Sequence, residues 1–369
     1  MHTRRPLSQL LRSLVIRLDL PLLWLLLILL TISLINMYSA GYALPGRFFD
    51  HLRNIVIALA VMWLVAHTPP QTLMRLALPM YIAGLLLLIA VALFGDVSKG
   101  ARRWLHLGVA RIQPSELMKI AMPLMLAWYF HMRETTLRPR HYLVATLLLI
   151  LPVGLIVRQP DLGTALLVLA AGFYVIFLAG LHWKILLGVL AAALGSLPLV
   201  WSMMHDYQRE RILTLLNPSN DPLGKGFHTI QSMIAIGSGG FTGKGWLEGS
   251  QAHLEFIPEH TTDFVLAVYS EEFGLLGNLV LLGVYLAIIF RGVTIAANAA
   301  NFFSRLLAGA ITLTFFTYAF VNIGMVSGIL PVVGVPLPFM SYGGTAMLTL
   351  GVAMGILMSI HRHRKLVQT

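Results

Sequence analysis

The sequence has few charged residues and no cysteine. Of its 369 residues, 11% are charged and 57% are hydrophobic, whereas a soluble globular domain has about 25% charged residues. This shortage of charge argues against a soluble protein, and the absence of cysteine excludes disulfides and thiol chemistry. The net charge of +11 does not indicate nucleic-acid binding, because the basic residues lie between long apolar runs, where they orient a membrane protein.

Long apolar runs recur at nearly regular intervals, and the mean hydropathy is +0.80. Each run is close to the ~20 residues that a helix needs to cross a ~30 Å hydrocarbon layer. We therefore predict an all-α polytopic membrane protein, a single domain over residues 1–369 with about ten transmembrane helices. The predicted helices cover 21–40, 52–68, 76–95, 114–131, 141–158, 161–181, 184–203, 263–290, 305–330 and 341–360.

The two ends of the chain predict its orientation. Basic residues gather at 4–17 and at 362–365, and an even number of crossings puts both ends on one side. The positive-inside rule makes that side cytoplasmic. The segment 204–262 is then a large extracytoplasmic loop between helices seven and eight. The first apolar run is long enough to span, so we expect a retained helix and no cleaved signal peptide.

One short outer segment breaks the positive-inside rule. It carries five basic residues, namely Lys99, Arg102, Arg103, Arg111 and Lys119. Glu116 lies three residues before Lys119, so the two share one helix face. They form either an interfacial ion pair or part of a clamp for phosphate or pyrophosphate, which Arg and Lys bind well. Because ATP is not available outside the cell, a reaction here would use a pre-activated substrate.

Two acids stand at predicted helix starts. Asp263 follows Thr261 and Thr262, either of which suits an N-cap position, and it would then lie in the first helical turn. Helix capping and a role as an ionised base are equally compatible with that position. Asp161 follows Pro160 in "RQPDLGT", where helix capping is the favoured interpretation.

Glu271 and Glu272 are adjacent acids inside an apolar run. Carboxylates at membrane depth need partners, water or a protein-lined interior. The pair is therefore either structural or part of a polar cavity.

Two further segments bear on the site. The stretch "GSGGFTGKGW" at 237–246 resembles a nucleotide phosphate loop, but Gly245 stands where Ser or Thr should follow the lysine. We reject nucleotide binding and expect a compact loop. The segment 324–347 contains three prolines and cannot be one continuous helix. Irregular backbone at the membrane survives where it is buried or lines a cavity, so we expect a re-entrant segment flanking a site.

Four motifs resemble the SEDS family (shape, elongation, division and sporulation), most closely its elongation branch. They are "KGARRWLHLGVARIQPSELMK", "RQPDLGT", the stretch from "MHDYQRERIL" to "VLAVYSEEFG", and "NIGMVSGILPVVGVPLPFMSYGG". The resemblance implies a peptidoglycan glycosyltransferase in the bacterial cytoplasmic membrane, which polymerises lipid II for cell elongation and rod shape. It makes Asp263 the essential acid. Polar residues on the pyrophosphate side match Arg103, Arg111, Glu116 and Lys119; Asp161 and Ser341 match supporting positions.

The resemblance also implies a chemistry and partners. Lipid II and a polyprenyl-pyrophosphate-linked glycan would react with inversion, aided by the cationic cluster and by a divalent cation (Mg²⁺ or Mn²⁺), without a nucleotide. A class B penicillin-binding transpeptidase and other membrane proteins of the elongation complex would be partners. One departure is that His260 lies one place earlier than the family pattern. The rival hypothesis is a lipid II flippase, which would need paired charges along a mid-membrane path and internal repeats.

Overall fold

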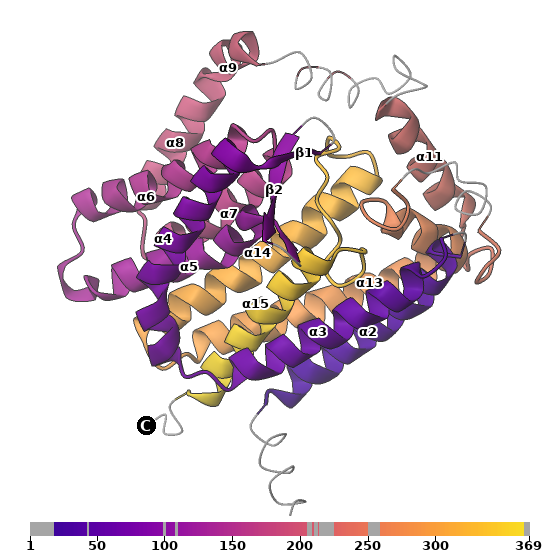
Figure 1. Cartoon of the computed structure of the whole chain (residues 1–369), viewed down its shortest axis with the longest axis horizontal. Helices are drawn as coiled ribbons and strands as arrows, with labels where there is room; N and C mark the ends of the chain where they lie inside the picture. Colours follow the sequence, from indigo (N-terminus) through magenta and orange to yellow (C-terminus); the bar gives the residue numbers. More distant parts are fainter. Residues whose placement is uncertain are drawn as a thin grey trace, which may run out of the picture.

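The computed structural model is a helical bundle (Figure 1). It describes residues 18–42, 44–98, 101–107, 110–204, 209, 213, 225–249 and 259–364. The helices of these residues are α2 (Leu20–Ala40), α3 (Arg47–Ala66), α4 (Pro70–Phe94), α5 (Pro114–His131), α6 (Pro139–Val157), α7 (Leu162–Leu178), α8 (Trp183–Gly195), α9 (Leu197–Met203), α11 (Lys225–Ser238), α13 (Val265–Ala297), α14 (Phe302–Val326) and α15 (Gly344–Arg362). A short 3₁₀ turn, η1, covers Glu134–Thr136.

The predicted all-α membrane class is confirmed. Among the described helices, α2, α3, α4, α6, α13, α14 and α15 are long and apolar enough to cross a membrane, and α7 is apolar but shorter. The predicted segments 114–131 and 184–203 also contain helices, α5 and the pair α8 and α9. Several predicted ends were wrong by a few residues: α3 begins at Arg47 and not at 52, and α4 begins at Pro70 and not at 76.

Two predicted spans are interrupted. The seventh divides at Ser196 into α8 and α9, two residues before Pro198, whose ring clashes with the backbone of the preceding helical turn. The eighth, α13, contains Gly274 with φ 62° and ψ −157°. Such angles suit glycine alone, so α13 consists of two helices joined at Gly274.

A small sheet lies between α4 and α5, and it was not predicted. Its strands are β1 (Asp96–Ser98), β2 (Ala101–Leu107) and β3 (Ala110–Ile112), antiparallel in the order β1-β2-β3. In the register, Asp96 faces Trp104 and Leu105 faces Ile112. The sheet carries the basic segment toward the start of α5.

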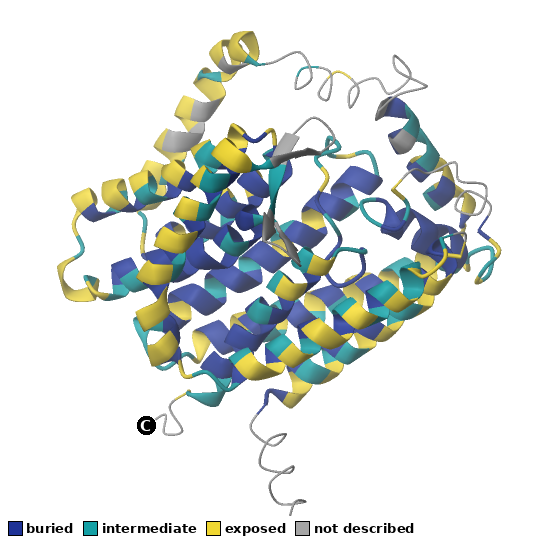
Figure 2. Cartoon of the chain, viewed as in Figure 1, coloured by how far each residue is buried: buried dark blue, intermediate teal, exposed yellow. Residues whose placement is uncertain are grey.

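Most buried apolar side chains of the described helices belong to one cluster. One cluster of buried apolar side chains runs from Leu18 to Ile360. Figure 2 shows exposed residues along the outer faces of α2, α3 and α6 and buried residues in the centre of the bundle. Exposed large apolar side chains such as Trp24, Leu86 and Phe290 suit contact with lipid tails, which replace water there.

The beginning of α2 and the end of α15 meet at one end of the bundle. Asp19 caps α2, and its carboxylate lies 2.6 Å from Arg291 of α13 and 3.1 Å from His361 of α15. The sheet lies toward the other end (Figure 1). The first and last described spans therefore begin and end on the same side, as an even number of crossings requires.

Candidate functional site

A cavity of about 810 Å³ opens near the sheet and gathers side chains from separate parts of the chain. The residues that line it include Arg53 (α3), Arg103 and Trp104 (β2), Gln113, Glu116 and Lys119 (start of α5), Asp161 and Thr164 (start of α7), Thr262 and Asp263 (before α13), Gly334 and Pro336, and Tyr342–Ala346. The cavity therefore combines carboxylates with cations. Of the residues predicted for a site, Arg103, Glu116, Lys119, Asp161 and Asp263 come together here.

Asp263 does not lie inside a helix. The first helical residue of α13 is Val265, and Phe264 is the capping residue without a side-chain cap. The predicted capping by Thr261 or Thr262 was therefore wrong. The Thr262 hydroxyl instead donates to the carboxylate of Glu259 at 3.0 Å. Asp263 thus sits in the turn that leads into the helix, beside the open cavity.

The backbone around Asp263 is fixed by α14. The amide of Asn322 donates to the carbonyl of Asp263 at 2.9 Å and to the carbonyl of Val335 at 2.8 Å. Residues 327–343 form no helix, so the predicted interruption of segment 324–347 is confirmed, although it is longer than the predicted helix ends at 330 and 341 allowed. A Cβ on Gly334 would lie 3.4 Å from Oδ2 of Asp263, and Gly334 has φ 74°. The irregular segment therefore passes directly beside the acid.

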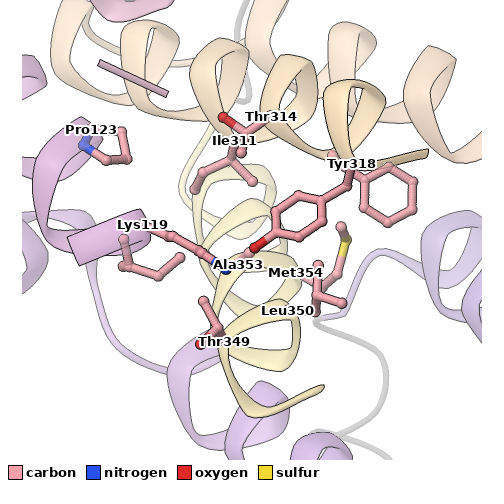
Figure 3. Close-up of a pocket in the computed structure, with 11 residues that line it drawn as sticks. Lys119, Pro123, Ile311, Thr314, Tyr318, Thr349, Leu350, Ala353 and Met354 are labelled. Atoms are coloured by element: carbon pink, nitrogen blue, oxygen red, sulfur yellow. The ribbon is translucent and has the colours of Figure 1, made fainter. Parts of the chain in front are cut away.

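Glu116 and Lys119 form a buried ion pair at 2.6 Å, with side chains 11% and 4% exposed. The second carboxylate oxygen of Glu116 is buried and has no hydrogen-bond partner within the described part of the chain. Lys119 also lines a narrow apolar cavity of about 20 Å³, and there its ammonium faces Tyr318 of α14 (Figure 3). The lysine thus stands between the site and this narrow cavity.

Asp161 serves both as a helix cap and as a wall of the cavity. Its Oδ1 accepts from the Thr164 amide at 3.2 Å, as the capping interpretation predicted, and its Oδ2 accepts from Gln113 at 3.0 Å. Arg103 donates to the carbonyl of Pro160 at 2.5 Å. The starts of α5 and α7 and strand β2 are joined in this way. Arg111 lies in β3, and its side chain is outside the described part of the chain.

The other predicted residues lie apart from this cavity. Ser341 is buried and accepts from the Leu337 amide at 2.8 Å, which stabilises the turn before Tyr342. Glu271 pairs with Lys244 at 2.6 Å, and Glu272 accepts from Ser39. The two glutamates form a separate buried cluster with the glycine-rich loop.

Sequence reasoning missed Arg53, Asn322 and Tyr318. Asn322 carried a usable signal, because an amide inside an apolar helix must find partners. Arg53 and Tyr318 carried none, because the register between packed helices decides which side chains lie at the cavity, as Arg53 does, or behind it, as Tyr318 does.

The family model described as "Cell cycle protein", which covers FtsW, RodA and SpoVE, matches residues 19–366. The chain belongs to the FtsW/RodA/SpoVE family. This confirms the SEDS resemblance, and the family match covers every residue of the site.

Relatives and solved structures agree with the family. The peptidoglycan glycosyltransferase MrdB of Escherichia coli K12 is 48% identical over 353 residues, 95% of each chain. The peptidoglycan glycosyltransferase RodA of Treponema pallidum is 30% identical, over 93% of this chain and 97% of the relative. Among solved structures, RodA of Thermus thermophilus matches with a TM-score of 0.71 at 30% identity, over 94% of this chain and 97% of that one.

A further solved chain comes from a peptidoglycan synthase complex that coordinates polymerization and crosslinking. It matches with a TM-score of 0.82 at 34% identity, over 94% of this chain and 99% of that chain. The similarity to this solved chain and to the sequence relatives therefore covers nearly the whole protein.

Proposed function

We propose that this multi-pass membrane protein is a peptidoglycan glycosyltransferase of the RodA type, which polymerises lipid II at the Asp263 cavity. The observation that carries the proposal is the grouping of Asp263 with Lys119, Arg103 and Glu116 around one open cavity. A carboxylate beside cations suits a reaction in which a hydroxyl loses a proton and a pyrophosphate departs. Relatives named for this activity cover 95% of the chain.

The reaction forms one glycosidic bond and breaks one bond to phosphate. The 4-hydroxyl oxygen of the terminal GlcNAc of lipid II attacks C1 of the donor glycan. The C1–oxygen bond to the pyrophosphate breaks with inversion, and polyprenyl pyrophosphate leaves with the bonding electrons. Asp263 takes the hydroxyl proton as general base, an effect typically worth 10²–10⁴-fold in rate.

Lys119 and Arg103 are the groups that balance the charge of the leaving pyrophosphate. Arg111 is assigned to the same role by the family resemblance. Glu116 holds the Lys119 ammonium at 2.6 Å, so the charge stays at a defined place. Fixed charges aimed at the leaving group stabilise the transition state because they need no reorganisation during the reaction.

A divalent cation fits this cavity. Among the described residues, no three His, Cys, Asp or Glu side chains converge on one metal site. Mg²⁺, however, is usually held by one or two carboxylates together with substrate phosphates. Glu116, one of whose carboxylate oxygens has no hydrogen-bond partner among the described residues, and Asp263 both line this cavity, and their carboxylates would hold Mg²⁺ or Mn²⁺ against the pyrophosphate. The bound ion would supply further charge for the leaving group.

The polyprenyl chains lie between helices. A groove of about 900 Å³ runs between α6, α7 and α8 and is lined largely by apolar side chains, among them Leu149, Leu169 and Phe173. The far side of α7 reaches the Asp263 cavity through Gly163, Thr164 and Leu167. One helix thus separates the polar site from a slot for lipid.

The partner is a class B penicillin-binding transpeptidase, alongside other membrane proteins of the elongation complex. The support is the structural likeness to a chain of a peptidoglycan synthase complex. The protein lies in the bacterial cytoplasmic membrane with both termini in the cytoplasm. The shared end of α2 and α15 and the basic residues in both tails support this orientation.

A reconstitution experiment tests the function against a flippase and a scaffold. Purified protein in vesicles receives lipid II, with and without the transpeptidase, and both glycan polymer and transbilayer movement of lipid II are measured. We expect polymer, and more of it with the partner. Movement without polymer favours a flippase, and neither activity favours a scaffold; both results contradict the proposal. The grouping of the charges in one cavity near an end of the bundle already favours the enzyme.

A further inference from the structure

Tyr318 is a buried polar residue directly behind the site. It lies on α14 with only 4% of its surface exposed, and it lines the narrow cavity below Lys119. Its hydroxyl points toward the Lys119 ammonium (Figure 3), and the two groups interact. The Lys119 Nζ lies 5.1 Å from the centre of the Tyr318 ring. Tyr318 is not among the residues that line the Asp263 cavity, whereas Lys119, which its hydroxyl faces, lines both cavities.

The Tyr318 hydroxyl affects how the N–H donors of Lys119 are distributed. An ammonium has three N–H donors, and Glu116 accepts one of them at 2.6 Å. The Tyr318 hydroxyl, toward which the ammonium points in the narrow cavity (Figure 3), can accept a second, and one donor then remains for a ligand in the Asp263 cavity. The two other hydroxyls of the narrow cavity, of Thr314 and Thr349, donate to carbonyls of their own helices. A flexible lysine held at two points has lost most of its freedom before a ligand arrives.

The surroundings make the hydroxyl hard to replace. The rest of the narrow cavity is mostly apolar, with Ile311, Phe315 and Met354 in its walls. A cavity of about 20 Å³ has room for about one water, but an ordered water needs two to four polar partners. Without the tyrosine oxygen, the ammonium would face apolar side chains on that side and would shift toward Glu116.

We propose that Tyr318 is a positioning residue that holds Lys119 at the distance needed to bind the leaving pyrophosphate. The inference rests on the proposed function, because it assigns Lys119 to that group. The ligand class is a lipid-linked pyrophosphate, whose second phosphate gives it more charge than the corresponding monophosphate. Loss of the hydroxyl therefore weakens binding of the pyrophosphate lipid more than binding of the monophosphate lipid.

The test measures binding of two probes to the purified full-length protein, a polyprenyl pyrophosphate and the matching polyprenyl monophosphate. Tyr318→Phe keeps the ring and its packing and removes only the oxygen. We expect it to weaken binding of the pyrophosphate lipid about tenfold, the scale of one hydrogen bond to a charged group, and binding of the monophosphate lipid by less. Tyr81→Phe is the matched control, because it removes a buried tyrosine hydroxyl that donates to Leu148 at 2.7 Å away from the site. It should bind both lipids as the wild type does.

A double-variant cycle shows whether Tyr318 acts through Lys119. Lys119→Met should weaken binding of the pyrophosphate lipid, and adding Tyr318→Phe should change it by no more than about twofold. Wild-type binding by Lys119→Met contradicts the proposed clamp and the inference together. Weak binding by Lys119→Met with wild-type binding by Tyr318→Phe contradicts the inference alone. Equal losses for both lipids, with a lower melting temperature, would make Tyr318 merely structural. If Lys119→Met does not fold, the comparison of the two lipids in Tyr318→Phe decides.

Discussion

At the scale of single residues, the reactive acid owes its place to its neighbours and not to helix capping. Asn322 fixes the carbonyl of Asp263, and Gly334 passes beside its carboxylate. The Asp263 side chain therefore projects from a turn whose backbone is hydrogen-bonded to Asn322 of α14. A base held by such surroundings can keep one geometry while substrate enters the cavity.

Gly334→Ala tests whether this close approach matters. Gly334 has φ 74°, and an added methyl group would contact Oδ2 of Asp263. The variant should lower kcat for polymerisation at least about tenfold, because small displacements of a reacting group are costly. Gly46→Ala is the control: its φ of 82° imposes similar backbone strain, but an added methyl group meets no atom within 4 Å. Equal kcat values for the two variants would show that strain alone is responsible.

Five charged residues of the cavity could be predicted from the sequence, because the predicted topology places the helix ends that carry them at the same side of the membrane. The membrane topology brought Arg103, Glu116, Lys119, Asp161 and Asp263 to one side. Local rules failed at the Thr261–Thr262 cap, where the turn at Glu259 takes the Thr262 hydroxyl instead. The residues on α14 depend on helix register, which no local pattern contains.

At the scale of elements, the helical hydrogen bonding of α13 is interrupted at Gly274, and the glycine-rich loop 237–246 supplies backbone partners there. The amides of Lys244 and Gly245 donate to the carbonyls of Glu271 and Glu272 at 3.0 and 3.1 Å, and Leu275 donates to Gly240 at 3.0 Å. Polar backbone groups freed inside a membrane helix need such partners. The loop therefore supports the first part of α13, which begins just after Asp263.

Gly243→Ala should open this contact. Gly243 has φ 84°, and a Cβ there would overlap the carbonyl of Glu272. We expect a lower melting temperature and faster hydrogen exchange in residues 239–249. Gly240→Ala shares a positive φ of 55° but meets no atom within 4 Å, so it should show only the cost of backbone strain, about 1–2 kcal/mol. A Gly243→Ala variant no less stable than Gly240→Ala would argue against a role for the loop as a clamp.

Most helices could be predicted because each apolar run has the length that a membrane requires. The small sheet could not, because β1 and β3 have three residues each and its charged residues indicated a loop. The break at Gly274 was also missed, since one glycine inside a long apolar run gives no sign of the loop that packs against it.

At the scale of the whole molecule, a buried charge cluster joins three distant helices. Asp19 accepts from the Leu22 amide at 2.9 Å and from two nitrogens of Arg291, the shorter bond being 2.6 Å. His361 adds a third contact at 3.1 Å. Burial alone would raise the pKa of Asp19, but the Arg291 hydrogen bonds, the Leu22 amide and the charge of His361 outweigh it and lower that pKa below its usual value.

Asp19→Asn should therefore destabilise the protein near neutral pH. Removing one partner of a buried pair costs about 3 kcal/mol or more. Because the folded-state pKa of Asp19 is lowered, its stabilisation is present above the ordinary aspartate value of about 3.9 and is lost as the pH falls through the lowered value. Thermal unfolding should show a gap between wild type and variant at neutral pH that narrows once the pH falls below about 4 and Asp19 itself takes up a proton.

The exposed pair of Asp50 and Arg53, at 3.0 Å, gives the control, because surface pairs contribute at most about 1 kcal/mol. Asp50→Asn should change the melting temperature little at any pH. A gap for Asp19→Asn that remains as wide at strongly acidic pH as at neutral pH would contradict the assignment of the ion pair.

The central claim is that Asp263 is the general base of a lipid II polymerase, and one rate measurement tests it most directly. Asp263→Asn keeps the shape of the side chain and should lower the polymerisation rate with the transpeptidase partner by about 10²–10⁴-fold, while lipid II still binds. Glu134→Gln, an exposed acid in η1, should leave the rate unchanged. A folded Asp263→Asn variant that polymerises lipid II at the wild-type rate would contradict the account.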